Sequence, residues 1–228
     1  MPVKARHALV TGASSGIGAA LIGRLLAEGW RVTGVARRST AHAHAAYSGV
    51  VCDLSDETAR EGLLTKLEGV DAFIHAAGFL ATGALGALES SAHASMWALH
   101  VAAAEHLADA LAPKMTLGGR IVLIGSRTAS GSAGRSQYAA TKAALVAMAR
   151  SWAIELAPRG ITANVVAPAA TDTPMLHDPI RADVAVRVPP IGRLIQPFEV
   201  AAAVAFLLSP DAGAITGQVL TICGGSSL

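Results

Sequence analysis

The sequence predicts an α/β protein built on a doubly wound parallel sheet of about seven strands. Short apolar runs alternate with helical patterns along all 228 residues, and a glycine-rich turn follows the first apolar run. Hydrophobic residues make up 52% of the chain and charged residues only 15%, which is typical of large buried interfaces and not of disorder. Because no repeat or linker divides the chain, we expect residues 1–228 to form a single domain.

Charge and hydropathy exclude two kinds of partner. A net charge of +2 without a run of basic residues argues against nucleic acid. The longest uncharged stretches, 72–88 and 212–228, are interrupted by glycines and too short to span a membrane. A strand pattern begins within a few residues of Met1, so we expect no signal peptide. Cys52 and Cys223 lie in apolar contexts and are expected to be buried, reduced thiols, in keeping with a soluble cytoplasmic protein.

The first strand, expected at 8–10, runs into a glycine-rich turn at 11–18, and a helical pattern follows as far as Gly29. Glycines in such a turn let the backbone approach a pyrophosphate, and the helix N-terminus offers free N–H groups. An ordinary tight turn is the alternative, but the position after the first strand favours a dinucleotide site. The residues expected to bind the dinucleotide here are Gly12, Ser14, Ser15, Gly16, Ile17 and Gly18.

The second strand, expected at 31–35, is followed by Arg37 and Arg38. A site for NAD usually carries an acidic residue here, which binds the ribose 2′-hydroxyl, and the sequence has none. Two guanidinium groups match the geometry of a 2′-phosphate instead, so we expect NADP. A solvated basic loop is the alternative, because surface arginines are common.

Two further strands are expected at 50–52 and 72–75, with a helix at 56–67 between them. After the earlier strand, Asp53 either accepts a hydrogen bond from an adenine amino group or caps the turn, and Leu54 follows it. Small residues after the later strand leave room for a nucleotide against the backbone; they are Ala76, Ala77 and Gly78.

The remaining expected elements are a helix at 91–112, a strand at 120–125, a helix at 136–158, a strand at 161–166, a helix at 198–208 and a strand at 219–222. His93 and His100 are seven residues apart on the first of these helices and are expected to share a face. The segment 176–197 has several prolines and weak periodicity, which favours a mobile lid over a site; a plain surface connection is the alternative.

Chemistry is expected where the strand at 120–125 ends. Ser126 follows that strand, at the edge where open α/β sheets hold ligands. Tyr138 and Lys142 are four residues apart on the next helix, so their side chains lie on one face. A free phenol has a pKa of about 10, and an ammonium group one turn away favours the phenolate and brings that pKa closer to neutrality. Without a dinucleotide site, the pair is better interpreted as ordinary neighbours on a helix surface.

These motifs occur together, in the order found in one enzyme family. The glycine-rich turn, Ala-Ala-Gly after the fourth strand, Ser126, the Tyr138-x-x-x-Lys142 pair and Pro168 with Thr173 resemble the short-chain dehydrogenases/reductases. The resemblance covers essentially the whole chain and is strongest to single-domain members such as the 3-oxoacyl-carrier-protein reductases. It implies a Rossmann-type sheet of seven strands.

The resemblance also implies a role for each matching residue. Tyr138 would be the catalytic acid/base, Lys142 would assist it and bind the nicotinamide ribose, and Ser126 would hold the substrate oxygen. The further cofactor contacts that it implies are Asp53 and Leu54 beside adenine, Ala76, Ala77 and Gly78 beside the adenosine half, Arg37 and Arg38 for NADP, Thr173 at the carboxamide, and Pro168, Ala169 and Thr171 in the same loop.

Four features depart from the family pattern. His100 stands where the family has an Asn in a water-linked proton relay; a neutral imidazole can pass protons, so we expect the relay to survive in altered form. Ala76 replaces the Asn of Asn-Ala-Gly, and Ala169 replaces the Gly of Pro-Gly. The interval from Ser126 to the tyrosine is one residue shorter than in many members, and Gly125, in the alternative register, has no hydroxyl.

The expected function is the NADP(H)-dependent interconversion of a carbonyl and a secondary alcohol, with hydride from the nicotinamide and the proton from Tyr138. An NAD-linked alcohol dehydrogenase of the same family and a non-catalytic dinucleotide-binding regulator are the alternatives. We expect a small carbonyl or alcohol substrate, a homo-oligomer (tetramer or dimer) and no metal, since the histidines have no companion ligands. The expected walls, 128–135 and 171–197, carry no charge pair or aromatic cage that identifies the substrate.

Overall fold

The computed structural model describes residues 5–67, 69–177 and 186–228. Its strands are β1 (His7–Thr11), β2 (Arg31–Ala36), β3 (Tyr47–Val51), β4 (Ala72–His75), β5 (Arg120–Ile124), β6 (Thr162–Pro168) and β7 (Val219–Ile222). They form one sheet in the order β3-β2-β1-β4-β5-β6-β7, and every neighbouring pair is parallel. The predicted doubly wound parallel sheet is therefore confirmed.

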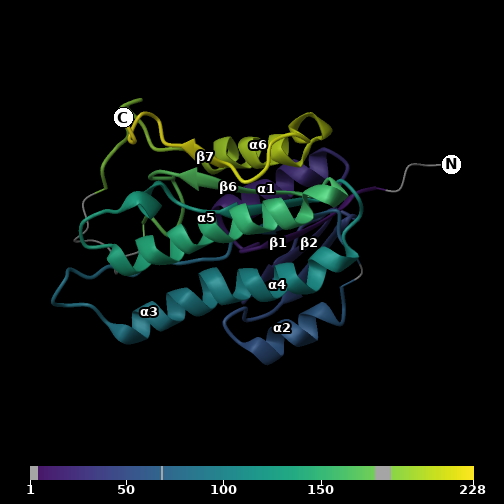
Figure 1. Ribbon diagram of the computed structural model, residues 1–228, viewed down its shortest axis with the longest axis horizontal. Helices are drawn as coiled ribbons and strands as arrows, with labels where there is room; N and C mark the ends of the chain where they lie inside the picture. Colours follow the sequence, from purple (N-terminus) through teal and green to yellow (C-terminus); the bar gives the residue numbers. More distant parts are fainter. Residues whose placement is uncertain (1–4, 68, 178–185) are drawn as a thin grey trace.

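Helices cover both faces of the sheet (Figure 1). They are α1 (Gly16–Ala27), α2 (Glu57–Leu64), α3 (Ser90–Trp97), α4 (Ala103–Leu111), α5 (Ser136–Leu156) and α6 (Pro197–Leu208), with short turns η2 (Ala112–Lys114), η4 (Ala157–Arg159) and η6 (Pro210–Ala212). On one face α1 and α6 pack together over a buried layer that includes Leu21 and Val204. On the other face α2, α4 and α5 enclose a second layer, which includes Leu107 and Leu145.

The edge strand β3 differs most from the prediction. It begins at Tyr47, whereas the sequence pattern placed its start at residue 50. An edge strand is paired on one side only, and the residues of β3 are half-buried or exposed. Its first residues, Tyr47, Ser48 and Gly49, lack the apolar run that marks a central strand. The following helix is also shorter than expected and ends at Leu64.

The long helix predicted at 91–112 is interrupted by a wide π-helical turn, η1 (Ala98–Ala102), between α3 and α4. Such turns hold one residue more than a regular turn and are frequent at functional sites. The two histidines expected to share a face have different surroundings. His93 is half-buried against Trp97, with 6.0 Å between ring centres, whereas His100 is fully buried inside the wide turn.

Both cysteines are free thiols, as expected, but only Cys52 is buried. Cys223 is half-buried because it follows β7, an edge strand whose residues are largely exposed. Among the described residues, no helix is long and apolar enough to cross a membrane.

Candidate active site

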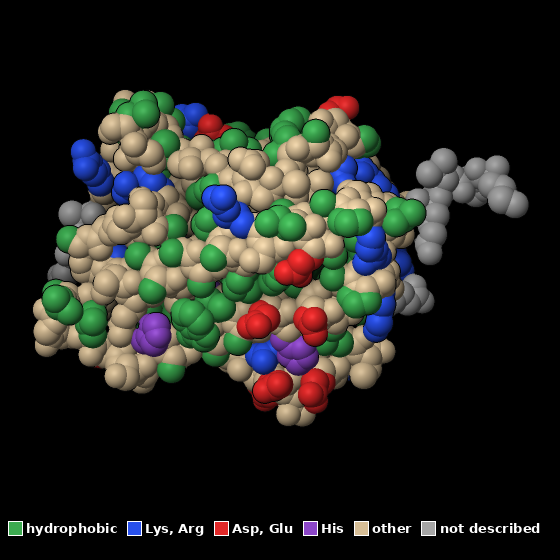
Figure 2. Space-filling view, in the orientation of Figure 1, with side chains coloured by type: hydrophobic (Ala, Val, Ile, Leu, Met, Phe, Trp, Pro, Cys, Tyr) green, Lys and Arg blue, Asp and Glu red, His purple; other side chains and the backbone are tan. Residues whose placement is uncertain are grey.

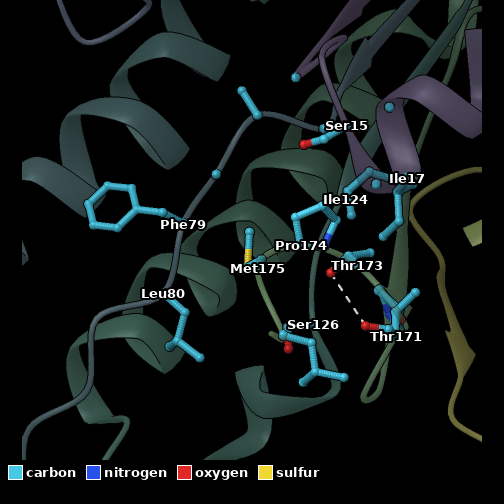
Figure 3. A pocket seen from close by; sticks show the side chains of 18 of the residues that line it. Ser15, Ile17, Phe79, Leu80, Ile124, Ser126, Thr171, Thr173, Pro174 and Met175 are labelled. Carbon is cyan, nitrogen blue, oxygen red and sulfur yellow. Dashed lines mark hydrogen bonds between the residues drawn. The ribbon is translucent and has the colours of Figure 1, made fainter. Parts of the chain in front are cut away.

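A cavity of about 480 Å³ opens at the carboxyl ends of the strands, the edge where parallel sheets hold ligands (Figure 3). Most predicted site residues line it: Gly12, Ser14, Ser15, Gly16, Ile17, Gly18, Arg37, Arg38, Leu54, Ala76, Ala77, Gly78, Ser126, Tyr138, Lys142, Pro168, Ala169, Thr171 and Thr173. Two predicted residues do not line it, Asp53 and His100. The structure thus gathers residues from the whole length of the sequence at one place.

The glycine-rich turn brings bare backbone to one end of the cavity. Gly12 has a φ of 72°, and a Cβ on it would lie 2.7 Å from the Ala76 carbonyl group. A Cβ on Gly16 would lie 3.1 Å from the Thr173 methyl group, and one on Gly18 would overlap with the Gly12 carbonyl oxygen. The turn therefore requires glycine at these positions, and it leaves the first N–H groups of α1 facing the cavity.

We expect Gly18→Ala to destabilise the protein by about 1–3 kcal/mol, because the added methyl group collides with backbone that cannot move away. Gly23→Ala in the same helix is the matched control. A Cβ there meets nothing within 4 Å, so this change should stabilise the helix by about 0.5–1 kcal/mol. Urea denaturation measures both free energies of unfolding, and shifts of equal sign would contradict the described packing.

A buried network that the sequence did not predict holds the loop after β4. The N–H groups of Ala76 and Ala77 each donate to Thr11 Oγ1 at 3.1 Å. That hydroxyl lies 3.0 Å from His75 Nδ1, and His75 Nε2 lies 3.1 Å from the Leu99 carbonyl oxygen. Since a carbonyl can only accept, Nε2 carries the proton and Nδ1 accepts from Thr11. Burial, with the Lys142 charge, lowers the pKa of His75 to about 3, so the ring stays neutral.

The loop after β3 is also fixed by side chains. Asp53 accepts hydrogen bonds from the Ser55 N–H group at 3.0 Å and hydroxyl at 2.7 Å, and these bonds lower the pKa of its carboxyl group. The turn cap is therefore present in the structure, and the expected hydrogen bond to an adenine amino group stays a prediction. Leu54 lines the cavity, and the buried Arg60 donates to the Leu54 carbonyl oxygen at 2.8 Å.

Ser126, Tyr138 and Lys142 all line the cavity. Ser126 Oγ accepts from the Thr128 N–H group at 3.1 Å, which leaves its own hydrogen for another acceptor. The Lys142 Nζ atom is buried, donates to the Ile124 carbonyl oxygen at 2.9 Å and lies 5.7 Å from the centre of the Tyr138 ring. Burial lowers the pKa of Lys142 to about 8, so the side chain is an ammonium at neutral pH.

The neighbouring glycine clarifies the register at Ser126. A Cβ on Gly125 would lie 2.5 Å from a Val165 methyl group on β6. A side chain at position 125 would therefore be crowded against β6, whereas Ser126 lines the cavity. Its side chain is labelled in Figure 3 at the end of the cavity away from Ser15.

His100 lies behind the cavity wall, and both of its ring nitrogens are engaged. The Phe79 N–H group donates to Nε2 at 3.1 Å, so Nδ1 carries the proton and donates to Thr141 Oγ1 at 2.8 Å. Thr141 in turn donates to the Tyr138 carbonyl oxygen at 2.8 Å. Burial first, and then the Lys142 charge, lowers the pKa of His100 to about 2. The neutral ring thus connects the Phe79 backbone after β4 with the Thr141 side chain on α5. Its expected role in a proton relay stays a prediction.

One wall of the cavity is apolar and was not predicted from the sequence. Phe79 and Leu80 follow β4, Leu99 comes from the π turn, and Met175 follows β6. No motif marks these single residues, and only the fold brings them together. The expected lid falls partly at 178–185, which lie outside the described residues.

A family model described as enoyl-(acyl carrier protein) reductase matches residues 12–227. The 3-oxoacyl-[acyl-carrier-protein] reductase FabG of Escherichia coli (strain K12) is 36% identical over 241 residues, which cover 99% of this chain and 98% of FabG. A short chain dehydrogenase from Burkholderia cenocepacia J2315, solved in complex with NADP, has a TM-score of 0.89 at 34% identity and covers 98% of each chain. The chain belongs to the short-chain dehydrogenase/reductase family. MabA of Mycobacterium bovis, also a 3-oxoacyl-[acyl-carrier-protein] reductase, is 35% identical and covers 100% of this chain and 95% of its own.

Positions where this short-chain dehydrogenase/reductase departs from the family pattern still contribute through their backbone. Ala76 donates its N–H group to Thr11, and Ala169 donates to the Ile222 carbonyl oxygen at 3.0 Å. The latter bond ties the loop after β6 to the end of β7. Both loops are therefore held by backbone hydrogen bonds although alanine stands at these two positions.

Proposed function

We propose that this chain interconverts a carbonyl and a secondary alcohol with NADP(H), and that Tyr138 supplies the proton. It is an NADP-dependent oxidoreductase acting on CH–OH groups, in keeping with its family and its FabG and MabA relatives. The observation that carries the residue roles is the joint presence of Ser126, Tyr138 and Lys142 in a cavity that also contains the glycine-rich turn. A panel of ketones with NADPH, followed by nicotinamide absorbance, tests the activity.

The residues present fit an NADP molecule. Gly12, Gly16 and Gly18 leave bare backbone beside the N-terminus of α1, where a pyrophosphate would be held. Arg37 and Arg38 stand at the end of β2 and suit a ribose phosphate. When bound, the cofactor supplies the hydride. Thr173, with Pro168, Ala169 and Thr171, would hold its nicotinamide end, and Leu54 and the loop 76–78 its adenosine end.

The chain's own groups handle the substrate oxygen and the proton. Ser126 has a hydroxyl hydrogen to donate to the substrate oxygen, which positions the carbonyl carbon. Tyr138 transfers a proton to the same oxygen as it gains negative charge. The Lys142 ammonium group, 5.7 Å from the phenol ring centre, stabilises the phenolate that remains. Two of its three hydrogens are left for a ribose after the bond to the Ile124 carbonyl oxygen.

We expect Arg37→Ala and Arg38→Ala each to raise KM for NADPH about 10- to 100-fold, because a charged hydrogen bond to phosphate is lost. KM for NADH should change little, since that cofactor has no 2′-phosphate. Arg150→Ala, an exposed arginine on α5, is the control. Equal effects on both coenzymes would favour the solvated-loop interpretation, and wild-type preference for NADH would favour the NAD-linked alternative.

We further propose that the protein acts in the cytoplasm as a single-domain homo-oligomer, a tetramer or dimer, on a small carbonyl or alcohol substrate. Assembly through α3–α4 and α5 is supported by apolar side chains exposed on them, Trp97 at 42% and Ile154 at 78%. In Figure 1 these helices run side by side across one face.

A further inference from the structure

The cavity holds more positive charge than the cofactor accounts for. Among the described residues that line it are five arginines and Lys142, and no aspartate or glutamate. Arg37 and Arg38 are assigned to the cofactor phosphate above. Arg127, Arg135 and Arg187 remain without an assigned role.

Two of these arginines flank the proposed catalytic residues. Arg127 directly follows Ser126 and begins the short helical turn η3 (Arg127–Ser130). Arg135 is the N-cap residue of α5, three residues before Tyr138. Its loop is joined to the loop after β4 by a bond from the Gly83 N–H group to the Gly134 carbonyl oxygen at 2.9 Å. Both arginines therefore line the cavity on the segments that carry Ser126 and Tyr138.

Arg187 reaches the cavity from a third segment. A few residues later this segment is joined to the C-terminal stretch by a bond from the Ile191 N–H group to the Gly224 carbonyl oxygen at 3.1 Å. Ser226, from the same C-terminal stretch, lines the cavity as well. Positive side chains thus approach the site from three separate parts of the chain.

These three arginines have no carboxylate partner among the described residues, and their side chains make no hydrogen bond there. Several other arginines are partnered: Arg193 forms a two-pronged pair with Glu199 at 2.7 and 2.8 Å, and Arg159 donates to two carbonyl groups. The visible acidic side chains gather mainly over α2 and α4, away from the cavity (Figure 2). A cleft lined by one sign of charge concentrates ligands of the other sign.

A pyrophosphate would be held at the glycine-rich turn that carries Ser15. In Figure 3 Ser15 lies in the upper part of the view and Ser126 in the lower part, so such a pyrophosphate would lie away from Ser126. Resting on the proposed function, we propose that the carbonyl substrate carries an anionic group, a carboxylate or a phosphate, held by Arg127, Arg135 and Arg187. The apolar wall of Phe79, Leu80 and Leu99 would cover the carbon chain between the carbonyl and that group.

Matched pairs of substrates test the proposal. The probes are 3-oxobutanoate, 4-oxopentanoate and 5-oxohexanoate, each compared with its methyl ester, with NADPH and the full-length chain. We expect kcat/KM for at least one acid to exceed that of its ester about tenfold or more. Arg127→Gln, Arg135→Gln or Arg187→Gln should lower kcat/KM for the acid about tenfold and leave the ester unchanged. Arg193→Gln, whose charge is already paired with Glu199, should change neither.

A second pair locates the source of the anionic group. The coenzyme A thioester of 3-oxobutanoate carries phosphates, whereas its N-acetylcysteamine thioester is neutral. A preference for the acids places the anion on a small substrate, and a preference confined to the coenzyme A thioester places it on a carrier arm. Both results support an anionic substrate.

Failure of the proposal is distinct from failure of the proposed function. Equal turnover of the neutral and anionic members of every pair, insensitive to the three arginine changes, would overturn the anionic substrate and leave the reductase intact. If no ketone is turned over, the proposed activity fails, and calorimetry on the NADP complex still decides the inference. Binding of the acids that is lost with the arginine changes supports it, and equal binding of acids and esters overturns it.

Discussion

Tyr138→Phe is expected to lower kcat for ketone reduction about 10²- to 10⁴-fold, the range that a positioned proton donor contributes. The phenol lines the cavity beside Lys142, and phenylalanine keeps the ring while removing the proton. The packing of the ring edge-on against His100, at 5.7 Å between centres, should survive the change. Steady-state turnover of the best ketone from the screen measures the effect.

A matched control is available because the chain has only two tyrosines. Tyr47→Phe removes the other phenol, which is hydrogen-bonded to Thr40 at 2.5 Å on the edge strand, and should leave kcat within about twofold. NADPH binding, followed by fluorescence, should be retained in both variants. Unchanged turnover in Tyr138→Phe would refute Tyr138 as the proton donor, and the absence of turnover in the native chain would favour the non-catalytic regulator.

Loss of the Lys142 ammonium group is expected to have the second-largest effect. Lys142→Met should lower kcat about 10²- to 10³-fold, because a preorganised charge beside the developing phenolate disappears. Burial lowers the pKa of Lys142 to about 8, so the charged form prevails below that pH and is lost above it. The native rate of ketone reduction should consequently fall as the pH rises through about 8, and the residual rate of the variant should lack this step.

The measurement is a pH profile of kcat at saturating NADPH for both proteins. In the proposed role the lysine acts on the phenol through its charge, with 5.7 Å between its nitrogen and the ring centre. A native rate that stays flat between pH 7 and pH 10 would contradict this role, and so would a variant that keeps the same alkaline step.

Local sequence was sufficient for the parts of the site that depend on a single turn or helix. The glycine-rich turn needs glycine for reasons that act within a few residues, and the Tyr138–Lys142 pair needs only helical spacing. The central strands carry continuous apolar runs, and β4 and β7 begin and end at the predicted residues. The sequence was less informative at β3, because its first three residues, Tyr47, Ser48 and Gly49, do not form an apolar run, whereas the other edge strand, β7, does.

Features that depend on long-range convergence could not be predicted. Arg135 and Arg187 fall within the expected walls 128–135 and 171–197, but no local pattern indicated that they share one cavity with Arg127. The bonds of His75 to Thr11 and to the Leu99 carbonyl oxygen join three elements, and no spacing rule connects them. Asp53 had two equally reasonable interpretations; its contact with Ser55 shows the turn cap, and the contact with adenine stays a prediction.

The number of residues in the π turn at Ala98–Ala102 determines how α3 is rotated relative to α4. Each residue of a regular helix advances the chain by about 100° and 1.5 Å. A one-residue deletion here would restore ordinary winding and rotate α3 against α4, so Leu99 would no longer accept from His75 and His100 would no longer reach Phe79. Insertions and deletions are consequently tolerated far less in this stretch than in the surface loops, and alignment gaps among functional homologues should avoid it.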